Sequence, residues 1–314
     1  MCIKQKWLNF PKKFTCIKDN TLLAPYKIAH ISDIHLPIEN LQFSTRSLCN
    51  KRFLSFLSWK KRQYNLQKKY LDNTIEDIKK FNPNLVLISG DLTNLALPEE
   101  FEQAAKWLRS LPFRKIYIVP GNHDALVKTN WNQTFALWTP WTMAFSQQDY
   151  PVIFKEDQIA IIGLNTAIPT LPFLANGRID HEQLKRLKDL LRKTREEQLI
   201  TIIMLHHPPL SNIVAKRKSL ENIKNLQNIL KKEGANLILY GHSHKTKTEK
   251  FLDIPILGIS SASSSSVKLN KKASWRKIFV ESDKHFSKIK FSVRSQTKNF
   301  NFIEEDFYSL TQAL

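Results

Sequence analysis

Five short polar clusters, each placed directly after an apolar run, constrain this chain more than any other feature. The clearest apolar run is Leu85–Ile88, which Ser89 and Gly90 separate from Asp91. Such a run predicts a strand that is buried on both faces, as in a sheet covered by helices. Gly90 allows a sharp turn of the backbone, and open α/β sheets place their ligands at such strand ends. We therefore expect Asp91 at the rim of a sheet.

The other four clusters follow the same arrangement. They are Asp33 with His35, the run from Gly121 to Asp124, His206 with His207, and the run from Gly241 to His244. The strands that they follow are expected at 27–32, 116–119, 201–205 and 236–240. Between the strands, helical patterns cover 66–80, 99–109, 181–195 and 219–232. Alternation of strands and helices is typical of βαβ units, which would bring the clusters to one edge.

The chain is expected to be a single α/β (α+β) domain over 1–314. From residue 245 onward the pattern changes to short strands, expected at 254–259, 275–280 and 289–293, so the C-terminal portion is mostly β. The run of serines from Ser260 to Ser266 predicts a turn or a mobile loop. Two segments stand apart from this scheme, a basic N-terminal segment (1–26) and an aromatic and basic insertion (46–64).

Charge is the most distinctive feature of the composition. The 314 residues include 48 Lys and Arg against 28 Asp and Glu, a net charge of +20. This excess favours anionic partners, such as phosphorylated substrates, an anionic membrane surface or nucleic acid, although a well-solvated surface would explain it equally well. The sequence contains no recognisable nucleic-acid-binding module.

Several features predict a cytoplasmic protein. The three cysteines, Cys2, Cys16 and Cys49, form no metal-binding or disulfide pattern, as expected in a reducing compartment. No apolar run approaches the roughly 18 residues of a spanning helix, and the N-terminus has no signal-peptide pattern. The insertion carries Phe53, Phe56 and Trp59 among basic residues. It is expected to pack its aromatic side chains on the protein body or, alternatively, to lie at the inner face of the membrane or line an apolar channel.

The residue types in the five clusters point to metal ions. The clusters hold three aspartates, an asparagine and six histidines, and no cysteine. Carboxylate, amide oxygen and imidazole together suit Mn, Fe, Zn or Ni. These side chains include at least seven possible ligands, which are too many for one ordinary site. They fit two metals that share a carboxylate and together bind a phosphoryl group.

In this order the clusters resemble the D-x-H, GD, GNH(D/E), H and GHxH signature of the calcineurin-like metallophosphoesterases. The match extends from about residue 33 to 244, most of the chain. The resemblance implies a four-layer α-β-β-α sandwich and a dinuclear centre, with Mn as the first choice of metal. It implies that one metal is bound by Asp33, His35 and His244, that the other is bound by Asn122, His206 and His242, and that Asp91 bridges the two.

The resemblance also implies a mechanism. A bridging water or hydroxide would attack phosphorus, and His123 would stabilise the transition state or protonate the leaving oxygen. Many relatives have an aspartate three residues after the bridging one, where this chain has Asn94. Either Asn94 or Asp124 is then expected to orient His123, so Asp124 is included as a catalytic candidate. His207, Asn94 and Asn165 are candidate substrate contacts, although His207 could equally be a loop-capping residue.

Residues 161–166 and 176–180, followed by a leucine-rich helix, resemble the branch known for cyclic-nucleotide phosphodiesterases. The expected function is therefore metal-dependent hydrolysis of a small phosphorylated substrate, a cyclic nucleotide or a similar diester. One alternative is a UDP-2,3-diacylglucosamine pyrophosphatase of lipid A synthesis, since those enzymes share the metal signature and the insertion could cover acyl chains. A nuclease is a further alternative. The sequence leaves the oligomeric state open.

Overall fold

The computed structural model describes residues 25–38, 51–282 and 286–313. The predicted basic segment 1–26 lies outside the described residues except for its last two positions. The first part of the insertion, 46–50, and the three cysteines also lie outside them. Within the described residues, no helix combines the length and the apolar character that crossing a membrane requires.

Two six-stranded sheets form the centre of the molecule. The first has the order β12-β11-β10-β1-β2-β3 and the second the order β4-β5-β6-β7-β9-β8. In chain order the strands are β1 Tyr26–Ile31, β2 Leu85–Ile88, β3 Ile116–Ile118, β4 Val152–Glu156, β5 Ile159–Gly163, β6 Ile200–Met204, β7 Leu237–Tyr240, β8 Lys247–Phe251, β9 Ile254–Gly258, β10 Ser274–Ser282, β11 Phe286–Gln296 and β12 Phe302–Ala313.

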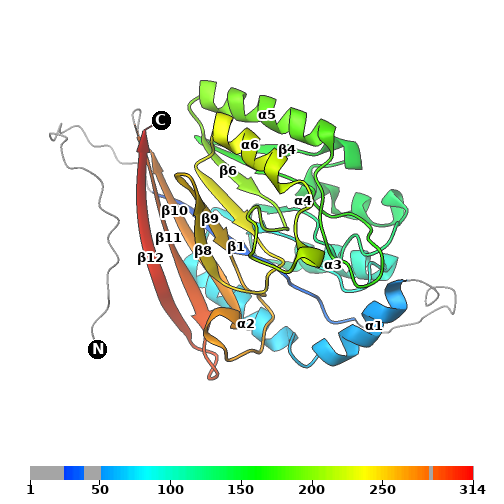
Figure 1. Cartoon of the computed structure of the whole chain (residues 1–314). Coiled ribbons are helices and arrows are strands. Elements are labelled where there is room, and N and C mark those ends of the chain that lie inside the picture. The colour runs from blue at the N-terminus through cyan, green and yellow to red at the C-terminus, as the bar shows by residue number, and fades with distance from the viewer. Residues whose placement is uncertain (1–24, 39–50, 283–285, 314) are drawn as a thin grey trace.

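Helices cover the outer faces of both sheets, so the molecule has four layers (Figure 1). Helices α2 and α3 pack on the first sheet, and α5 and α6 pack on the second. This arrangement confirms the predicted α-β-β-α sandwich. The helices are α1 Lys51–Arg62, α2 Lys68–Phe81, α3 Pro98–Ser110, α4 Thr139–Thr142, α5 His181–Glu196 and α6 Ile223–Glu233, with 3-10 turns at Trp131–Gln133, Phe135–Trp138, Gln147–Asp149, Lys216–Lys218 and Leu269–Lys271.

The position of strand β2 between two cores explains why its sequence is apolar throughout. Leu85 and Leu87 belong to the core between the two sheets, whereas Val86 and Ile88 belong to the core under α2 and α3. All four side chains are fully buried, because successive residues of a strand point to opposite faces and both faces are covered here. The double burial predicted from the apolar run is therefore confirmed.

Most predicted elements agree with the structure to within a few residues. Asp180 caps α5, since its Oδ1 accepts a hydrogen bond from the Gln183 N–H at 2.7 Å. The prediction lacks three strands, β4, β8 and β12. Along β12 the apolar Ile303 and Phe307 are exposed, whereas Glu304 and Glu305 are half-buried, so no regular alternation marks it as a strand.

The serine run 260–266 contains the predicted turn, at Ala262 and Ser263. Ser260 and Ser261 are fully buried there, and Ser261 Oγ donates to the carbonyl of Asp33 at 2.6 Å.

Candidate metal centre

The loops that follow β1, β2, β3, β6 and β7 meet at one edge of the sandwich, because each set of strands is parallel and adjacent within its sheet. Backbone hydrogen bonds join the first two loops directly. The N–H groups of Asp33 and His35 donate to the carbonyls of Gly90 (3.0 Å) and Asp91 (2.9 Å). The five clusters that the sequence places after strands thus come from both sheets to one location.

The backbone at this edge is strained. Asp33, His35, Asp91, His242 and His244 all have positive φ angles, between 47° and 63°. Residues with a side chain rarely adopt this region, and such conformations concentrate at functional sites. Five of the seven candidate metal ligands are held in it, so each loop turns its side chain back toward the common centre.

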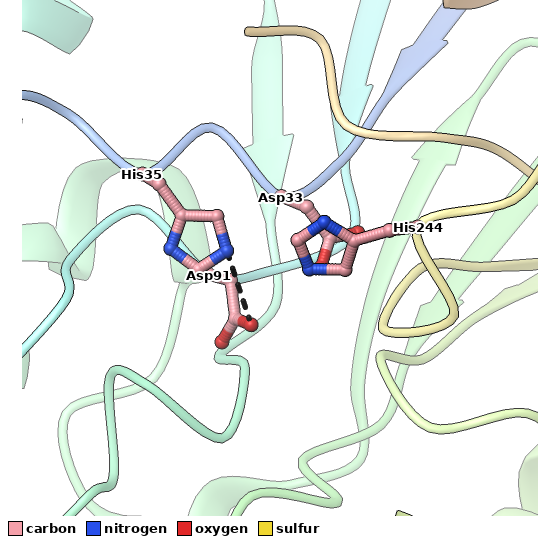
Figure 2. A group of neighbouring side chains, drawn as sticks. All are labelled: Asp33, His35, Asp91 and His244. Carbon is pink, nitrogen blue, oxygen red and sulfur yellow. Dashed lines mark ion pairs between the residues drawn. The ribbon is translucent and has the colours of Figure 1, made fainter. Parts of the chain in front are cut away.

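Asp33, His35, Asp91 and His244 form the first group of candidate ligands, drawn in Figure 2. One ligand atom from each residue lies within 4.8 Å of the others. His35 Nε2 is 3.8 Å from Asp91 Oδ2, and His244 Nε2 is 3.2 Å from Asp33 Oδ1. The rings of His35 and His244 stack, with centroids 5.3 Å apart. Except for His244, which is one-third exposed, the group is buried.

Asp91 also belongs to the second group, with His206 and His242. His206 Nε2 lies 3.3 Å from Asp91 Oδ2 and 3.2 Å from Asn122 Oδ1. His242 donates from Nε2 to the carbonyl of Lys218 at 2.9 Å, which leaves Nδ1 as the ring atom available to a metal. Asp91 is therefore the residue common to both groups.

The hydrogen bonding of these histidines shows that the residues fit cations. His206 Nδ1 faces the carbonyl of Ser89 at 2.7 Å and His35 Nδ1 faces that of Thr93 at 3.2 Å. A carbonyl can only accept, so both rings carry a proton on Nδ1 and a neutral ring has a lone pair at Nε2. Each Nε2 then points at carboxylate or amide oxygens, which are also acceptors. His35 Nε2 and Asp33 Oδ1 are buried with no hydrogen-bond partner, and a metal ion would satisfy both.

The electrostatics of the centre are those of a cation site. Burial disfavours charge on Asp91, yet the neighbouring histidines, His206 first, hold its pKa well below the usual value. Burial likewise opposes a charge on His206, but the Asp91 carboxylate raises the pKa of His206 to about 9. The carboxylate at the centre therefore favours a positive partner, which either a proton on His206 or a metal ion can provide.

Comparison with known sequences identifies the family. The sequence model of the calcineurin-like phosphoesterases matches residues 26–246. This chain belongs to that family. It is thus a hydrolase that acts on phosphoester bonds. A Synechococcus protein named as a probable cyclic nucleotide phosphodiesterase is 26% identical over 213 residues, which cover 66% of this chain and 76% of that protein. A Nostoc protein named as a 3′,5′-cyclic-nucleotide phosphodiesterase is 26% identical over 237 residues, which cover 74% of this chain and 77% of that protein.

Solved structures of the calcineurin-like fold also resemble this chain. A dimetal phosphatase from Danio rerio superposes with a TM-score of 0.54 and 12% identity, over 92% of this chain and 98% of that one. The purple acid phosphatase PPD1 from yellow lupin superposes with a TM-score of 0.55 and 12% identity, over 91% of this chain and 53% of that one. At this identity the likeness concerns the fold.

His123 is held by the backbone. Its Nδ1 donates to the carbonyl of Asn94 at 2.8 Å, and its own N–H donates to Asp91 Oδ1 at 2.7 Å. The ring lies edge-on to that of His35, with centroids 4.9 Å apart. The side chain of Asn94 is directed elsewhere, donating to the carbonyl of Leu36 at 2.7 Å. Asn94 therefore orients His123 through its main chain, so its side chain can differ from the aspartate of many relatives.

The sequence makes Asp124 a catalytic candidate, and its contacts in the structure are mostly with the loop that carries Asp91. Its buried carboxylate accepts hydrogen bonds at 2.8–3.0 Å from the N–H groups of Asp91, Leu92, Thr93 and Gly121 and from the Thr93 hydroxyl. Burial, together with the charge of Asp91, raises the pKa of Asp124 to about 7. Asp124 fixes the loop that carries Asp91, and the ring of His123 is oriented by a different group.

The three candidate substrate contacts also have other tasks in the structure. His207 is fully buried and bonds to Thr166 Oγ1 at 2.7 Å and to the carbonyl of Ala175 at 3.2 Å. The side chain of Asn165 accepts from the Ala167 N–H at 2.9 Å. Asn94, described above, is 1% exposed. Because these side chains are buried and bond within the protein, they support the loops, and contact between them and substrate stays a prediction.

Sequence reasoning missed the groups that orient the metal-ligating histidines. These are the carbonyls of Ser89, Thr93 and Lys218, which bond to His206, His35 and His242. Such outer partners set the ring orientation and tautomer of a ligand. Any residue can supply a carbonyl, so the sequence carries no signal for them.

Proposed function

We propose that this protein hydrolyses a phosphodiester bond in a small phosphorylated substrate, a cyclic nucleotide or a similar diester, with two divalent metal ions, Mn²⁺ by preference. The observation that carries the proposal is the position of Asp91 in two separate groups of buried ligands. Two ions that share a carboxylate are the arrangement that clamps a phosphoryl group. The names of the Synechococcus and Nostoc relatives support the diester.

Each group at the centre then has a definite task. When bound, the metals supply Lewis acidity and lower the pKa of water. Asp91 holds both ligand groups in register, and the carbonyls of Ser89 and Lys218 keep His206 and His242 in their metal-binding tautomers. His123, with its proton held on Nδ1 by Asn94, presents Nε2 to the substrate. When Nε2 is protonated, it can donate a hydrogen bond to the phosphoryl oxygens or a proton to the leaving oxygen.

Metal reconstitution tests this proposal. The protein is treated with a chelator, dialysed against Mn²⁺, and assayed for bound metal and for hydrolysis of bis(p-nitrophenyl) phosphate. Activity should be absent after chelation and should return in proportion to metal, reaching its maximum near two ions per chain. Full activity in the chelated protein, or saturation at one ion, would contradict the dinuclear mechanism.

A second candidate substrate is a lipid-linked nucleotide, as in the UDP-2,3-diacylglucosamine pyrophosphatases. The observation in its favour is the apolar surface of α1, where Phe53, Leu54 and Leu57 are 42%, 37% and 45% exposed. Phe56, in contrast, packs on the core beneath. One side of the helix therefore packs on the body, and the exposed apolar groups are available to a lipid chain or a membrane surface.

Helix α1 is tied to two loops of the site. Arg52 donates to the carbonyls of Leu95 and Ala96, in the loop that follows Asp91, at 3.0 and 2.7 Å. Lys51 donates to Thr170 Oγ1 and to the carbonyl of Leu174. The loop 169–177 also exposes Leu171 (72%) and Phe173 (74%). We call α1 and residues 169–177 the outer rim, a surface whose exposed apolar groups suit acyl chains or an anionic membrane surface.

Paired variants distinguish the two substrates. If the lipid candidate is right, Phe53→Ser with Leu57→Ser should lower turnover of UDP-2,3-diacylglucosamine by about tenfold or more, from the loss of two apolar contacts, and leave bis(p-nitrophenyl) phosphate turnover intact. Phe307→Ser is the matched control, since Phe307 is 69% exposed on β12, away from the rim (Figure 1). Normal turnover of the lipid by the double variant would remove this candidate.

A further inference from the structure

A basic hollow lies directly beside the metal centre. It measures about 520 Å³ and is lined by residues of the loop after β6, and of the loop between β7 and β8: Asn212, Ile213, Val214, Ala215, Lys216, Lys218, His242, Ser243 and Lys245. The lining contains three lysines and no acidic residue. One wall is His242, a candidate metal ligand, so the hollow begins where the second metal group ends.

The loop that carries the lysines is fixed to the centre. The carbonyl of Lys218 accepts the hydrogen bond from His242 Nε2 at 2.9 Å. On its other side, Arg217 donates to the carbonyl of Phe173 in the outer rim at 3.1 Å. The lysines therefore occupy a defined place between the metal ligands and the outer rim, which is where the part of a substrate beyond the scissile phosphorus would lie.

Two of the lysines in the hollow, Lys216 and Lys245, lie apart from the described acidic side chains. Within the described part of the chain, no carboxylate forms an ion pair with Lys216 or Lys245. Lys216 is exposed and Lys245 is half-buried. Like charges that line one hollow repel one another, and ammonium groups are common partners of phosphate.

We infer that the hollow binds a second phosphate of the substrate, linked to the scissile phosphate through a bridging oxygen. This inference rests on the two-metal phosphohydrolysis of the proposed function, and it replaces the cyclic nucleotide with a diester of diphosphate as the substrate. A cyclic nucleotide has a single phosphate, whose charge the metal ions would neutralise, and it has no second anion for Lys216 and Lys245. A diphosphate that carries an organic group at each end has a second phosphate, which would lie beside these lysines.

The reaction is then a simple hydrolysis. One water adds across the diphosphate linkage: a P–O bond forms at the phosphorus beside the metals, the bond from that phosphorus to the bridging oxygen breaks, and the second phosphate leaves with the bridging oxygen. The products are two phosphate monoesters, and the protons of the water end on them. A phosphate monoester is a weaker base than an alkoxide, so its departure demands less of a general acid. That suits His123, whose Nδ1 is held by the main-chain carbonyl of Asn94.

The test compares two substrates that share adenosine and differ in the second phosphate. The Mn²⁺-loaded protein is assayed with diadenosine 5′,5′-diphosphate and with cyclic AMP. Wild type should prefer the diphosphate in kcat/KM. Lys216→Ala and Lys245→Ala should each reduce kcat/KM for the diphosphate by about tenfold, the size of one charge-assisted hydrogen bond, and that for cyclic AMP by much less. Lys216→Arg and Lys245→Arg should restore most of the loss.

A binding measurement gives a second readout. Calorimetry of the Mn²⁺-loaded protein should show tighter binding of α,β-methylene-ADP than of AMP, and the lysine variants should abolish that difference. Lys106→Ala and Lys185→Ala, at exposed positions of α3 and α5, are the controls for lost net charge. Equal losses for both substrates, or preference of the wild type for cyclic AMP, would overturn the inference. Failure to hydrolyse either substrate or bis(p-nitrophenyl) phosphate would instead refute the proposed function, and the inference with it.

Discussion

The metal centre and the outer rim meet at the same edge of the sandwich, but they are built in opposite ways. At the centre, polar ligands are buried, strained and held by backbone hydrogen bonds. At the rim, apolar side chains such as Phe53 and Phe173 are exposed, and a few long side chains attach them to the body. We propose a division of labour, in which the buried part fixes the chemistry and the exposed part helps to select the substrate.

Loss of the shared ligand should have the largest effect. Asp91→Ala removes a carboxylate from both metal groups, so we expect metal content to fall and kcat to drop by about 10³-fold or more, beyond the 10–100-fold typical of an outer partner. Metal analysis and bis(p-nitrophenyl) phosphate kinetics measure this. Asp189→Ala, at an exposed position of α5, is the control. Wild-type activity in Asp91→Ala would contradict the proposal that the buried centre carries out the chemistry.

Gly90 tests the strained backbone of the centre. Its φ is +97°, and an added Cβ would lie 2.7 Å from both the Gly121 nitrogen and His206 Nδ1. Gly90→Ala should lower the free energy of unfolding by about 1–3 kcal/mol and reduce kcat/KM by about 10²-fold through displacement of a metal ligand.

The matched control for Gly90 is Gly234→Ala at the end of α6. Gly234 also has a positive φ, +76°, but nothing lies within 4 Å of its added Cβ. It should lose about 1 kcal/mol of stability and no activity. Equal kinetic effects in the two variants would show that strain alone, and not the position of His206, determines activity.

A variant of Asn94 tests whether His123 depends on the main-chain carbonyl of Asn94 or on its side chain. Asn94→Ala keeps the carbonyl that holds His123 but removes the hydrogen bond to the Leu36 carbonyl. We expect a loss of about 1–3 kcal/mol in stability from the unpaired buried carbonyl, measured by urea unfolding, with kcat within about threefold of wild type because the contact to His123 is kept. Asn94→Asp should not raise kcat. A large rise would mean that His123 is reached by that side chain after all.

A buried histidine behind the centre predicts a pH dependence of stability. Burial, assisted by the charge of Arg276, lowers the pKa of His30 from 6.5 to about 3. Its contribution to stability is therefore complete above pH 6.5 and is lost as the pH falls toward 3, since the unfolded chain binds a proton that the folded chain does not. The loss should approach about 1.4 kcal/mol per pH unit.

The measurement is urea unfolding of the chelated protein between pH 7 and pH 4.5, for wild type and His30→Gln. Glutamine can still bond to the Ser89 hydroxyl, which His30 Nε2 meets at 2.8 Å. The variant should lose stability less steeply with falling pH. Identical slopes would show that His30 is protonated in the folded protein.

The smallest effect is expected at the outer rim. Lys51→Met removes the hydrogen bonds to Thr170 and Leu174, but the side chain is partly exposed, so the free energy of unfolding should fall by less than about 1 kcal/mol. Metal content should stay at the wild-type level. Loss of metal from this variant would show that the two regions are coupled and that the rim contributes to the chemistry.

The sequence by itself determined the fold class and the residues of the centre. Double burial of β2 follows from the unbroken run Leu85–Ile88, and the clusters after parallel strands must share an edge. Spacing along the chain also identified the cap of α5 at Asp180. These are local patterns, and the physical rule behind each needs only neighbouring residues. Strand β12, without such a pattern, was missed.

Only the tertiary structure decided which groups serve the ligands. Asp124 and Asn94 are polar residues in a metal-binding loop, and their sequence positions alone favoured catalysis or substrate contact. Their actual partners are backbone groups, brought to them by loops from separate strands. The hollow with Lys216 and Lys245 likewise joins two segments that are distant in the chain. Main-chain carbonyls and N–H groups are the same at every position, so only the folded backbone determines which of them a side chain meets.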